Sequence, residues 1–333
     1  MDTIIFSGRS NLPLSSKICS ILEKKEESKF EGLVEVKTFA GGDIYCKYKD
    51  NIRGKDVIII QSTSDPNKDW MELFLLVQTA RLASARQITV VIPYFSYARQ
   101  DRKAEPRSPI SARLMLDLLK TSGASRIITV DLHNLSIQGF TDLPLDSLLP
   151  CNLWINYIKA HYIKNKKDSK KYVVASPDFG GAKKTQKYAE ILGTDFAIVH
   201  KKRLSDTKTE QKTVIGDVKG KSVFLIDDMT ESLGTLSGAS KILKKNGAKD
   251  VFAFVTHLPL TFDGRCNLES DKSIKKVLTT DSVDLMVDDD QYIDEFIGGD
   301  KIEVLSIAPM LAEAISCTVN NKSISKLFQI KGF

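Results

Sequence analysis

Short runs of apolar, mostly β-branched residues recur along the chain and limit the folds that it can adopt. The runs are continuous rather than alternating with polar residues, which is typical of strands buried on both faces of a sheet. Leucines at helical spacing mark the segments between many of them, at residues 71–83, 109–120 and 236–245. Because strands that alternate with helices build parallel sheets covered by helices, the sequence predicts an α/β fold with mostly parallel sheets. The predicted strands are residues 3–6, 57–60, 88–92, 126–130, 172–175, 196–199, 222–226 and 251–255.

A turn that leads from a helix into a strand occurs three times in similar form, at residues 85–88, 123–127 and 247–251. A repeated helix–turn–strand unit would suit two similar halves, with a boundary near residues 145–155. Such turns are also common in any α/β protein, so these residues alone leave both interpretations open. The length of 333 residues accommodates one large domain or two of ordinary size.

Composition and charge restrict the class of protein. Hydrophobic residues make up 42% of the chain, which is enough to bury a sizeable core. The net charge of +6 arises from 48 basic and 42 acidic residues and is spread along the chain. This small excess suits phosphate ligands and does not indicate a nucleic-acid partner. No apolar stretch approaches about 18 residues, so we expect no membrane span.

The N-terminus and the cysteines indicate the compartment. The first eight residues contain neither a basic segment nor a long apolar run, so they do not resemble a signal peptide. The five cysteines are odd in number, far apart and without a CxxC pair. This pattern argues against a disulfide framework or a zinc site and favours a reducing compartment. We therefore predict a cytoplasmic protein.

The strongest local signal is the predicted strand 222–226, which is followed by Asp227 and Asp228 and then by a turn with serine, glycine and threonine at residues 229–235. In open α/β sheets, ligands bind beyond the carboxyl ends of the strands. Backbone N–H groups and hydroxyls at the start of a helix suit a monophosphate, and two acids suit sugar hydroxyls or a metal held through water. The alternative is a helix cap whose acids favour the helix dipole. Two adjacent acids before such a turn favour the binding site.

A second unusual segment, residues 201–221, follows the predicted strand 196–199 and is polar, with no clear period before Val214. A long polar loop after a buried strand is uncommon, and such loops often act as lids over a site. We predict a mobile lid here, and a partly disordered surface loop is the alternative.

Several motifs together resemble one enzyme family. The segment 222–235 is similar to the phosphoribosyl-pyrophosphate (PRPP) loop of type I phosphoribosyltransferases (PRTases). Other motifs narrow the resemblance to the ribose-phosphate diphosphokinases, or PRPP synthetases, and they are specific in combination. They are IFSG at residues 5–8, IQSTS at 60–64, MEL at 71–73, PYFSYARQDRK at 93–103, DLH at 131–133, SPDFGGAK at 176–183, HKKR at 200–203 and MLAEA at 310–314.

This resemblance implies an α/β protein of two similar PRTase-like domains, each with a mostly parallel central sheet flanked by helices. The first domain would span residues 1–150, and the second, residues 151–333, would carry the ribose-5-phosphate loop. The implied activity is transfer of the diphosphate of MgATP to C1 of ribose 5-phosphate, which gives PRPP and AMP for nucleotide biosynthesis. ATP and ribose 5-phosphate are the implied partners and Mg²⁺ the implied cofactor, with no nucleic acid and no membrane.

The resemblance also implies residues that bind ATP and the metal. Arg99 and Gln100 would contact the nucleotide, since arginine suits phosphate oxygens, and Asp101 would orient their loop. His133 and Asp178 would be the metal positions, and His133 would also act on the ATP phosphates. A lone histidine is more often structural, but both residues follow predicted strands. An adenine-binding hairpin would consist of Phe39, Gly41, Gly42 and Asp43.

Catalysis and ribose 5-phosphate binding are implied for the second half of the chain. Lys201 and Arg203, at the head of the polar segment, would be the catalytic cations, and Arg203 would also contact ribose 5-phosphate. Diphosphoryl transfer needs positioning and charge neutralisation, which two such cations supply. The ribose-5-phosphate loop would comprise Asp227, Asp228, Glu231, Ser232, Leu233, Gly234 and Thr235.

Four positions depart from the family pattern. Gly41 replaces an aspartate and Asp43 a glutamate, while Glu231 replaces an aspartate and Ser232 a threonine. These departures motivate an alternative, a non-catalytic PRPP-synthetase-like subunit that regulates an active partner. A second alternative is a transferase that uses PRPP with a base, against which the adenine hairpin and the loop of Arg99 argue.

The resemblance implies oligomerisation and regulation as well. In the family, the adenine hairpin reaches the site of a neighbouring subunit, so we expect a homo-oligomer built from dimers, namely a hexamer. We also expect an allosteric anion site for phosphate or a nucleotide. The matching residues are Arg53, Arg107, Gln138, Ser323 and Ser325.

Overall fold

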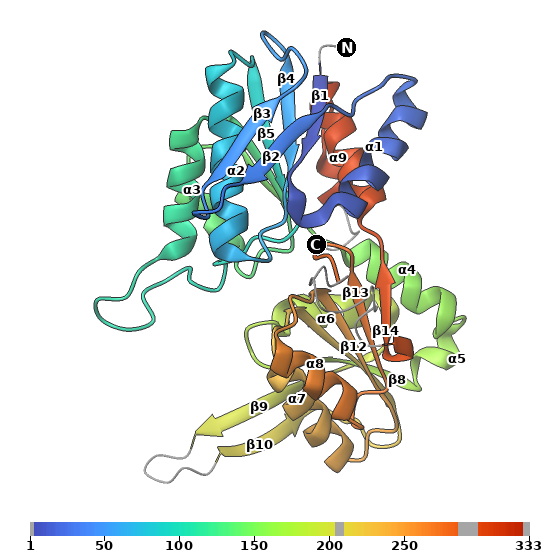
Figure 1. Cartoon of the computed structure of the whole chain (residues 1–333). Helices are drawn as coiled ribbons and strands as arrows, with labels where there is room; N and C mark the ends of the chain where they lie inside the picture. The colour runs from blue at the N-terminus through green and yellow to red at the C-terminus, as the bar shows by residue number, and fades with distance from the viewer. Residues whose placement is uncertain (1–2, 204–209, 286–298, 329–333) are drawn as a thin grey trace. The chain divides into compact units, whose positions relative to one another are not determined.

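The computed structural model describes residues 3–203, 210–285 and 299–328; of residues 201–203 and 210–212 it describes the backbone alone. The chain forms two compact units, which we describe separately (Figure 1). Of the described residues, those up to Leu149 together with Ser282–Asp284 and Ser306–Phe328 make up the first unit. The remainder makes up the second unit.

The first unit contains a five-stranded parallel sheet with helices around it. Its strands lie in the order β1, β4, β5, β6, β7, and each pairs in parallel with its neighbour. Apolar side chains of the strands and helices share one core, for example Ile59, Leu73 and Leu116, none of which is exposed. The strands are β1 (Thr3–Ser7), β4 (Asp56–Ile60), β5 (Gln87–Ile92), β6 (Arg126–Val130) and β7 (Leu145–Leu148); the helices are η1 (Arg9–Asn11), α1 (Leu12–Glu26), α2 (Pro66–Leu82), α3 (Ser111–Ser122), η2 (Leu135–Phe140), α9 (Ala308–Val319) and α10 (Ser325–Phe328).

A separate antiparallel hairpin of β2 (Val34–Thr38) and β3 (Ile44–Tyr48) also belongs to the first unit. Thr38 pairs with Ile44, so the chain turns at residues 39–43. The hairpin packs against α2, where the hydroxyl of Tyr48 donates a hydrogen bond to the carbonyl of Leu76 at 2.9 Å. The position of the turn is therefore tied to the body of the first unit.

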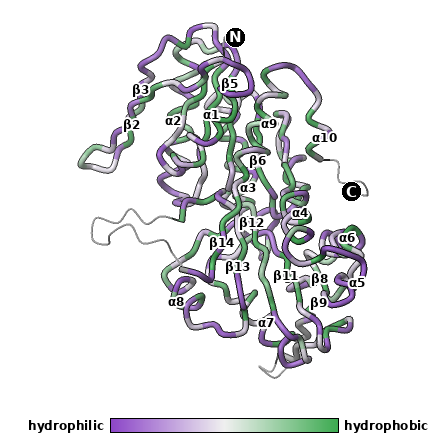
Figure 2. The backbone as a smooth tube through the Cα atoms, turned by 90° about the vertical axis from the view of Figure 1, so that its right-hand side faces the viewer, coloured by the Kyte–Doolittle hydropathy of each residue, from purple (hydrophilic) through white to green (hydrophobic). Residues whose placement is uncertain are grey.

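The second unit contains a seven-stranded sheet in which all neighbours are parallel except β9 and β10. The order is β10, β9, β8, β11, β12, β13, β14. Every residue of β12 is buried, and Figure 2 shows the green of hydrophobic residues along the inner strands. The strands are β8 (Tyr172–Ser176), β9 (Asp195–Arg203), β10 (Glu210–Ile215), β11 (Ser222–Met229), β12 (Val251–His257), β13 (Lys276–Thr280) and β14 (Ile302–Leu305); the helices are α4 (Cys151–His161), α5 (Lys166–Ser169), α6 (Ala182–Leu192), α7 (Gly234–Lys245), α8 (Phe262–Ser270) and η3 (Gly299–Lys301).

The predicted α/β fold with mostly parallel sheets is confirmed, and every predicted strand is present. The predicted loop at residues 201–221 is wrong for much of its length, whereas its action as a lid stays a prediction. Strand β9 continues to Arg203, which pairs with Glu210 at the start of β10. Strand pairing satisfies backbone N–H and C=O groups whatever the side chains are, so a polar sequence can form a hairpin at a sheet edge. The tip of this hairpin, residues 204–209, lies outside the described residues.

The C-terminal segment is grouped differently from the division at residue 150. That division assigned residues 306–328 to the second domain, whereas the structure groups them with the first unit. Helix α9 lies beside α1 (Figure 1), and Lys25 and Glu313 form an ion pair at 2.5 Å. Glu26 of α1 accepts a hydrogen bond from the hydroxyl of Ser316 at 2.6 Å. These contacts, with the buried apolar face of α9, draw the end of the chain back to the first unit. None of the described helices is long and apolar enough to cross a membrane.

Both units follow the same succession of elements, which favours a structural repeat over a chance similarity of turns. In the first unit the succession is β1, α1, the β2–β3 hairpin, β4, α2 and β5; in the second it is β8, α6, the β9–β10 hairpin, β11, α7 and β12. The strands β1–β4–β5 and β8–β11–β12 are parallel neighbours in the same order. The loop after β4 therefore corresponds to the loop after β11.

The loop after β4 is closed by a carboxylate of the helix that follows it. Asp69, in the first turn of α2, accepts hydrogen bonds from the N–H of Asp65 at 2.8 Å and from the hydroxyl of Ser64 at 3.4 Å. Asp69 is almost fully buried, and burial raises its pKa to about 6. Because negative charge is favourable at a helix N-terminus, Asp69 supplies an anion to this loop from within the chain.

Candidate active site

Two loops of the first unit carry the residues predicted to meet ATP. Arg99 follows β5 and His133 follows β6, and both residues are exposed. Because β5 and β6 are parallel neighbours, both loops leave the same edge of the sheet. Asn134 Nδ2 donates a hydrogen bond to Asp101 Oδ2 at 2.6 Å and so links the two loops. The structure therefore brings the segments of Arg99 and His133 together within one unit.

The backbone of both loops is strained. Tyr97 has φ 65° and Asp131 has φ 45°, a left-handed conformation that costs a non-glycine residue about 1–2 kcal/mol. The N–H of Asp131 is held by the carbonyl of Leu148 at 2.8 Å. Gln100 connects its loop to α3, because its Oε1 accepts a hydrogen bond from the hydroxyl of Ser111 at 2.5 Å. Strain that the surroundings maintain is typical of functional loops.

The predicted adenine hairpin is a tight turn at the end of β2 and β3. The N–H of Phe39 donates to the carbonyl of Asp43, and the N–H of Gly42 donates to the carbonyl of Phe39, both at 2.8 Å. Gly42 has φ 93°, which favours glycine, whereas a Cβ at Gly41 would meet nothing nearer than Asp43 Oδ2 at 3.5 Å. Phe39 as a residue is 56% exposed, so its ring is accessible for stacking on a base.

In the second unit, acidic residues gather at the carboxyl edge of the sheet. Asp178 follows β8, and Asp227 and Asp228 lie within the last residues of β11, the parallel neighbour of β8. Strand β11 thus continues to Met229, three residues beyond the predicted strand 222–226. Burial, together with the negative charges of Asp228 and Asp178, raises the pKa of Asp227 well above its usual value. A carboxylate in such a cluster is unfavourable unless a cation or hydrogen-bond donors accompany it. The cluster therefore suits a ligand that supplies hydroxyl groups or a metal ion.

Replacing Asp227 by asparagine is expected to stabilise the second unit and to lower activity. The change removes one of the clustered charges, and such changes commonly add about 0.5–2 kcal/mol to the free energy of unfolding. Because the pKa of Asp227 is raised, wild type takes up the proton as the pH falls, and the gain should shrink at acid pH. Thermal melting against pH and the KM for ribose 5-phosphate measure the two effects.

The matched control for that substitution is Asp217→Asn. Lys221 lowers the pKa of Asp217, so this exposed carboxylate is favourable in the folded state and its loss should not stabilise the protein. A fall in stability for Asp227→Asn would show that the folded state holds the Asp227 carboxylate favourably, which contradicts the cluster argument.

The loop after the acids is built for binding at a helix N-terminus. Helix α7 begins at Gly234, and Leu233, which precedes it, has a left-handed φ of 58°. The N–H of Leu233 donates to the hydroxyl of Thr230 at 3.1 Å. The first N–H groups of a helix have no partner within the helix and therefore suit an anion. Glu231, Ser232, Gly234 and Thr235 are exposed, whereas the side chain of Leu233 is fully buried, so Leu233 contributes through its backbone alone.

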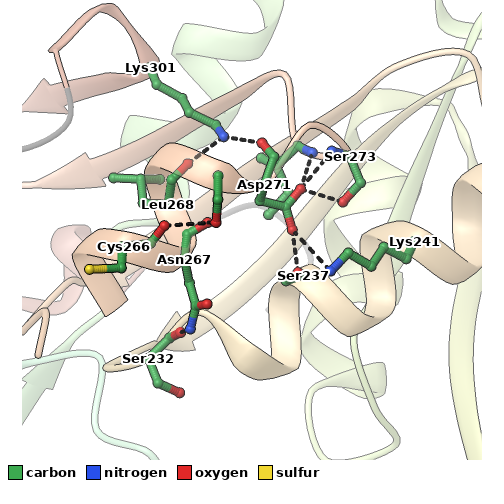
Figure 3. Close-up of polar contacts among 11 residues, drawn as sticks. Ser232, Ser237, Lys241, Cys266, Asn267, Leu268, Asp271, Ser273 and Lys301 are labelled. Carbon is green, nitrogen blue, oxygen red and sulfur yellow. Dashed lines mark hydrogen bonds and ion pairs between the residues drawn. The ribbon is translucent and has the colours of Figure 1, made fainter. Parts of the chain in front are cut away.

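Helix α8 braces this loop from one side, a feature that the sequence did not predict. The N–H of Thr261 donates to the carbonyl of Glu231 at 3.0 Å. Asn267 Nδ2 donates to the carbonyl of Ser232 at 3.0 Å (Figure 3). Thr261 and Asn267 lie 30 and 35 residues further along the chain than their partners, and no local pattern marks them.

The remaining candidates are placed less fully. Lys201 and Arg203 lie on β9, paired with Lys212 and Glu210, but their side chains fall outside the described residues. His133 belongs to the first unit and Asp178 to the second. Within the ranges that the structure describes, no group of three His, Cys, Asp or Glu side chains is arranged to hold a metal ion.

The predicted allosteric residues do not converge within one chain. Arg53 precedes β4 at the amino edge of the sheet, where its Nη1 donates to the hydroxyl of Ser84 at 3.2 Å. Arg107 and Gln138 follow β5 and β6 and so lie at the opposite, carboxyl edge. Ser323 and Ser325 hydrogen-bond to each other at 2.8 Å after α9. The structure therefore does not bring Arg53 together with Arg107 and Gln138 within one chain.

Comparison with known proteins bears on the whole chain. Residues 3–123 match the family model of the N-terminal domain of ribose phosphate pyrophosphokinase, and residues 207–329 match that of the phosphoribosyl synthetase-associated domain. The ribose-phosphate pyrophosphokinases of Hyphomonas neptunium and Fusobacterium nucleatum are 42% and 39% identical to it; each match covers 97% of this chain, and 99% and 97% of theirs respectively.

A solved structure agrees with these matches. The crystal structure of phosphoribosylpyrophosphate synthetase from Mycobacterium smegmatis is similar to this chain with a TM-score of 0.85 and 35% identity, over 96% of this chain and 100% of that one. The agreement of sequence and fold over nearly the full length shows that the chain belongs to the ribose-phosphate pyrophosphokinase family.

Proposed function

We propose that this chain transfers the β,γ-diphosphate of MgATP to the C1 hydroxyl of ribose 5-phosphate, forming PRPP and AMP. The observation that carries the proposal is the segment of residues 227–235, in which two acids at the end of β11 are followed by a short turn and the N-terminus of α7 at the carboxyl edge of the sheet. Acids suit ribose hydroxyls and the helix start suits a 5-phosphate. Membership of the family supports the same reaction.

In this reaction the protein positions the two substrates and neutralises the charge of the phosphates, and it forms no covalent intermediate with them. The ribose C1 oxygen forms a bond to the β-phosphorus while the bond from that phosphorus to the α,β-bridging oxygen breaks. AMP leaves with the bridging oxygen, and the proton of the C1 hydroxyl passes to solvent. In this proposal Asp227 and Asp228 orient the ribose, and Arg99 and Lys201 neutralise charge on the phosphates.

Mg²⁺ fits the donors that the chain offers. Magnesium prefers oxygen ligands, keeps several waters and often binds through one or two carboxylates plus substrate phosphates. Asp178 has an exposed carboxylate whose Oδ1 also accepts the N–H of Gly181 at 3.2 Å, so it would offer the ion an oxygen ligand. His133, the other position that the resemblance implies, is exposed as well. When bound, the ion would polarise phosphoryl oxygens and offset the charge of the triphosphate.

The test is an assay of the purified chain for AMP release from ATP and Mg²⁺, with and without ribose 5-phosphate. We expect AMP and PRPP in equal amounts, and only when ribose 5-phosphate is present. Release of pyrophosphate from PRPP with a free base would favour the base transferase. If the purified chain shows no turnover by itself but stimulates a catalytic relative, the regulatory subunit is favoured.

Replacing Glu231 by aspartate is expected to leave kcat/KM for ribose 5-phosphate unchanged or improved. The family carries aspartate here, and glutamate moves the carboxylate outward by about one methylene; errors of ~1 Å matter at reacting centres. The backbone of Glu231 is held by Thr261, so the side chain alone should respond. Steady-state kinetics with ribose 5-phosphate as the varied substrate measure the change.

Two outcomes would revise that interpretation of Glu231. Loss of activity in Glu231→Asp would show that this chain requires the glutamate, and the geometric reasoning would be wrong. An inactive wild type that Glu231→Asp with Ser232→Thr restores would make the regulatory subunit the better reading.

We also propose a homo-oligomer built from dimers, as a hexamer, in the cytoplasm. The adenine hairpin ends in an exposed pair of rings, Phe39 and Tyr45, 6.0 Å apart and 56% and 42% exposed, which suits contact with another chain. Light scattering on the active protein should give several chains per particle. A fully active monomer would contradict the proposal.

We also propose the allosteric anion site for phosphate or a nucleotide. Activity that is insensitive to phosphate and ADP, apart from competition of ADP with ATP, would contradict this site.

A further inference from the structure

Helix α8 contacts the backbone of the proposed ribose-5-phosphate loop at two successive carbonyl groups. Thr261, the N-cap of α8, donates both its N–H, at 3.0 Å, and its hydroxyl, at 3.3 Å, to the carbonyl of Glu231. Asn267 Nδ2 donates to the carbonyl of Ser232 at 3.0 Å. The helix approaches so closely that a Cβ on Gly264 would lie 2.2 Å from the carbonyl oxygen of Glu231. These contacts hold the loop by its peptide groups rather than by its side chains.

Holding these carbonyls also sets the direction of the loop's N–H groups. In a trans peptide the N–H points opposite to the C=O of the same peptide unit. Because the carbonyls of Glu231 and Ser232 point toward α8, the N–H groups of Ser232 and Leu233 point away from it. The peptide between Ser232 and Leu233 is held at both ends, since its N–H donates to the Thr230 hydroxyl at 3.1 Å. The start of α7 is thereby oriented.

The brace is itself anchored at the other end of α8. The carboxylate of Asp271, which is 2% exposed, accepts a hydrogen bond from the hydroxyl of Ser237 of α7. It also accepts hydrogen bonds from the N–H and from the hydroxyl of Ser273, both of which are 2.6 Å long (Figure 3). Lys301 donates to the carbonyl of Leu268 at 2.5 Å and to that of Asp271. The contacts therefore close a ring from the loop through α7, Asp271 and α8 back to the loop.

We propose that Asn267 is a positioning residue for the sugar phosphate: it fixes the Ser232–Leu233 peptide, and through it the start of α7, so that the N-terminus of α7 binds the 5-phosphate of ribose 5-phosphate. The proposal rests on the proposed function, which assigns the 5-phosphate to this loop. Because the side chain of Asn267 bonds to the Ser232 carbonyl, the proposal has it act on the substrate through the backbone of the loop. Losing its hydrogen bond should therefore weaken binding of one substrate and spare the other.

The experiment compares Asn267→Ala and Asn267→Asp with Asn246→Ala and Asn246→Asp. Asn267→Asp keeps the shape of the side chain but replaces the donor by an acceptor facing the Ser232 carbonyl. We expect both Asn267 variants to raise the KM for ribose 5-phosphate about tenfold, the size of one hydrogen bond, with kcat and the KM for ATP within about twofold of wild type.

Asn246 is a matched control on the same unit. It is exposed like Asn267, and its Nδ2 donates to the carbonyl of Ile242 at 2.8 Å, at the far end of α7. Its substitution should lower the melting temperature about as much as that of Asn267 but leave the KM for ribose 5-phosphate unchanged. A purely structural role of Asn267 would not separate the two positions.

Calorimetric titration with ribose 5-phosphate, without ATP, measures the same effect without turnover. Weaker binding in the Asn267 variants alone supports the proposal. Equal changes in both KM values, or equal effects of the two asparagines on binding, would overturn it while the wild type remains active. Wild type that binds ribose 5-phosphate but does not turn over would count against the proposed function alone, and the titrations of the variants would still decide the role of Asn267.

Discussion

Replacing Lys201 by alanine is expected to lower kcat by about 10²–10³ and to leave the affinity for ribose 5-phosphate largely intact, because one charge contact to the transition state contributes on that order. Lys201 lies on β9, paired with Lys212 of β10, in the hairpin that follows the succession β8–α6. Strand pairing on this hairpin places Lys201 by a hydrogen-bonded backbone rather than by a free loop. Single-turnover measurement of AMP formation separates the chemical step from product release.

Lys202 offers the matched control for Lys201. It is the next residue of β9 and pairs with Gln211, so Lys202→Ala removes the same charge from the same strand. We expect its kcat to stay within a few-fold of wild type. A near-normal kcat for Lys201→Ala, or equal losses for both variants, would remove Lys201 from the mechanism and leave only the general charge of the hairpin.

Replacing Arg9 by alanine is expected to destabilise the first unit by about 3–5 kcal/mol, because it leaves a buried carboxylate without its cation. The side chain of Glu72 is fully buried; Arg9 Nε lies 2.8 Å from its Oε2, and the N–H of Arg9 donates to its Oε1 at 2.7 Å. Arg9 Nη2 also donates to the hydroxyl of Thr38 at 3.0 Å, next to the adenine hairpin. The variant should therefore also raise the KM for ATP.

Each unit contains one of the two tryptophans, Trp70 in the first and Trp154 in the second, and both are buried. In a Trp154→Phe background, fluorescence melting follows the first unit alone.

The control is Arg86→Ala, which breaks two hydrogen bonds to Asp56 at 2.8 and 2.7 Å in a pair whose side chains are 58% and 29% exposed. An exposed pair contributes at most about 1 kcal/mol. Similar losses in both variants would contradict the burial argument for Glu72.

Continuous apolar runs predicted most of the inner strands because burial on both faces removes polar residues from the sequence itself. Strand β12, buried at every position, is the clearest case. The same reasoning missed β2, β3, β7, β10, β13 and β14. Of these, β2 has no fully buried residue and β10 lies at a sheet edge, whereas β13 is an inner strand with four buried residues. Pairing with a neighbour, rather than side-chain polarity, makes these segments strands, and pairing is not visible in a local pattern.

The candidate site could be predicted as far as strand ends determine it. Asp227 and Asp228 lie near the carboxyl end of β11, although the strand continues to Met229 instead of ending before the acids as predicted. Arg99 and His133 follow adjacent strands as expected. Contacts between segments that are distant in the sequence could not be predicted. The return of α9 to α1 and the hydrogen bond of Asn267 to Ser232 depend on how helices pack once the sheets exist.

The repeat of elements in the two units has a consequence for stoichiometry. The loops after β4 and β11 correspond, yet Asp69 supplies a carboxylate of the chain itself to the first of them, through the N–H of Asp65 and the hydroxyl of Ser64. A phosphate approaching that loop would meet a resident negative charge, whereas the loop at residues 231–235 starts its helix with exposed residues. The two units have the same order of elements, but of these two described loops only that of the second unit is free of a carboxylate of this kind. Each chain is therefore expected to bind one ribose 5-phosphate rather than two.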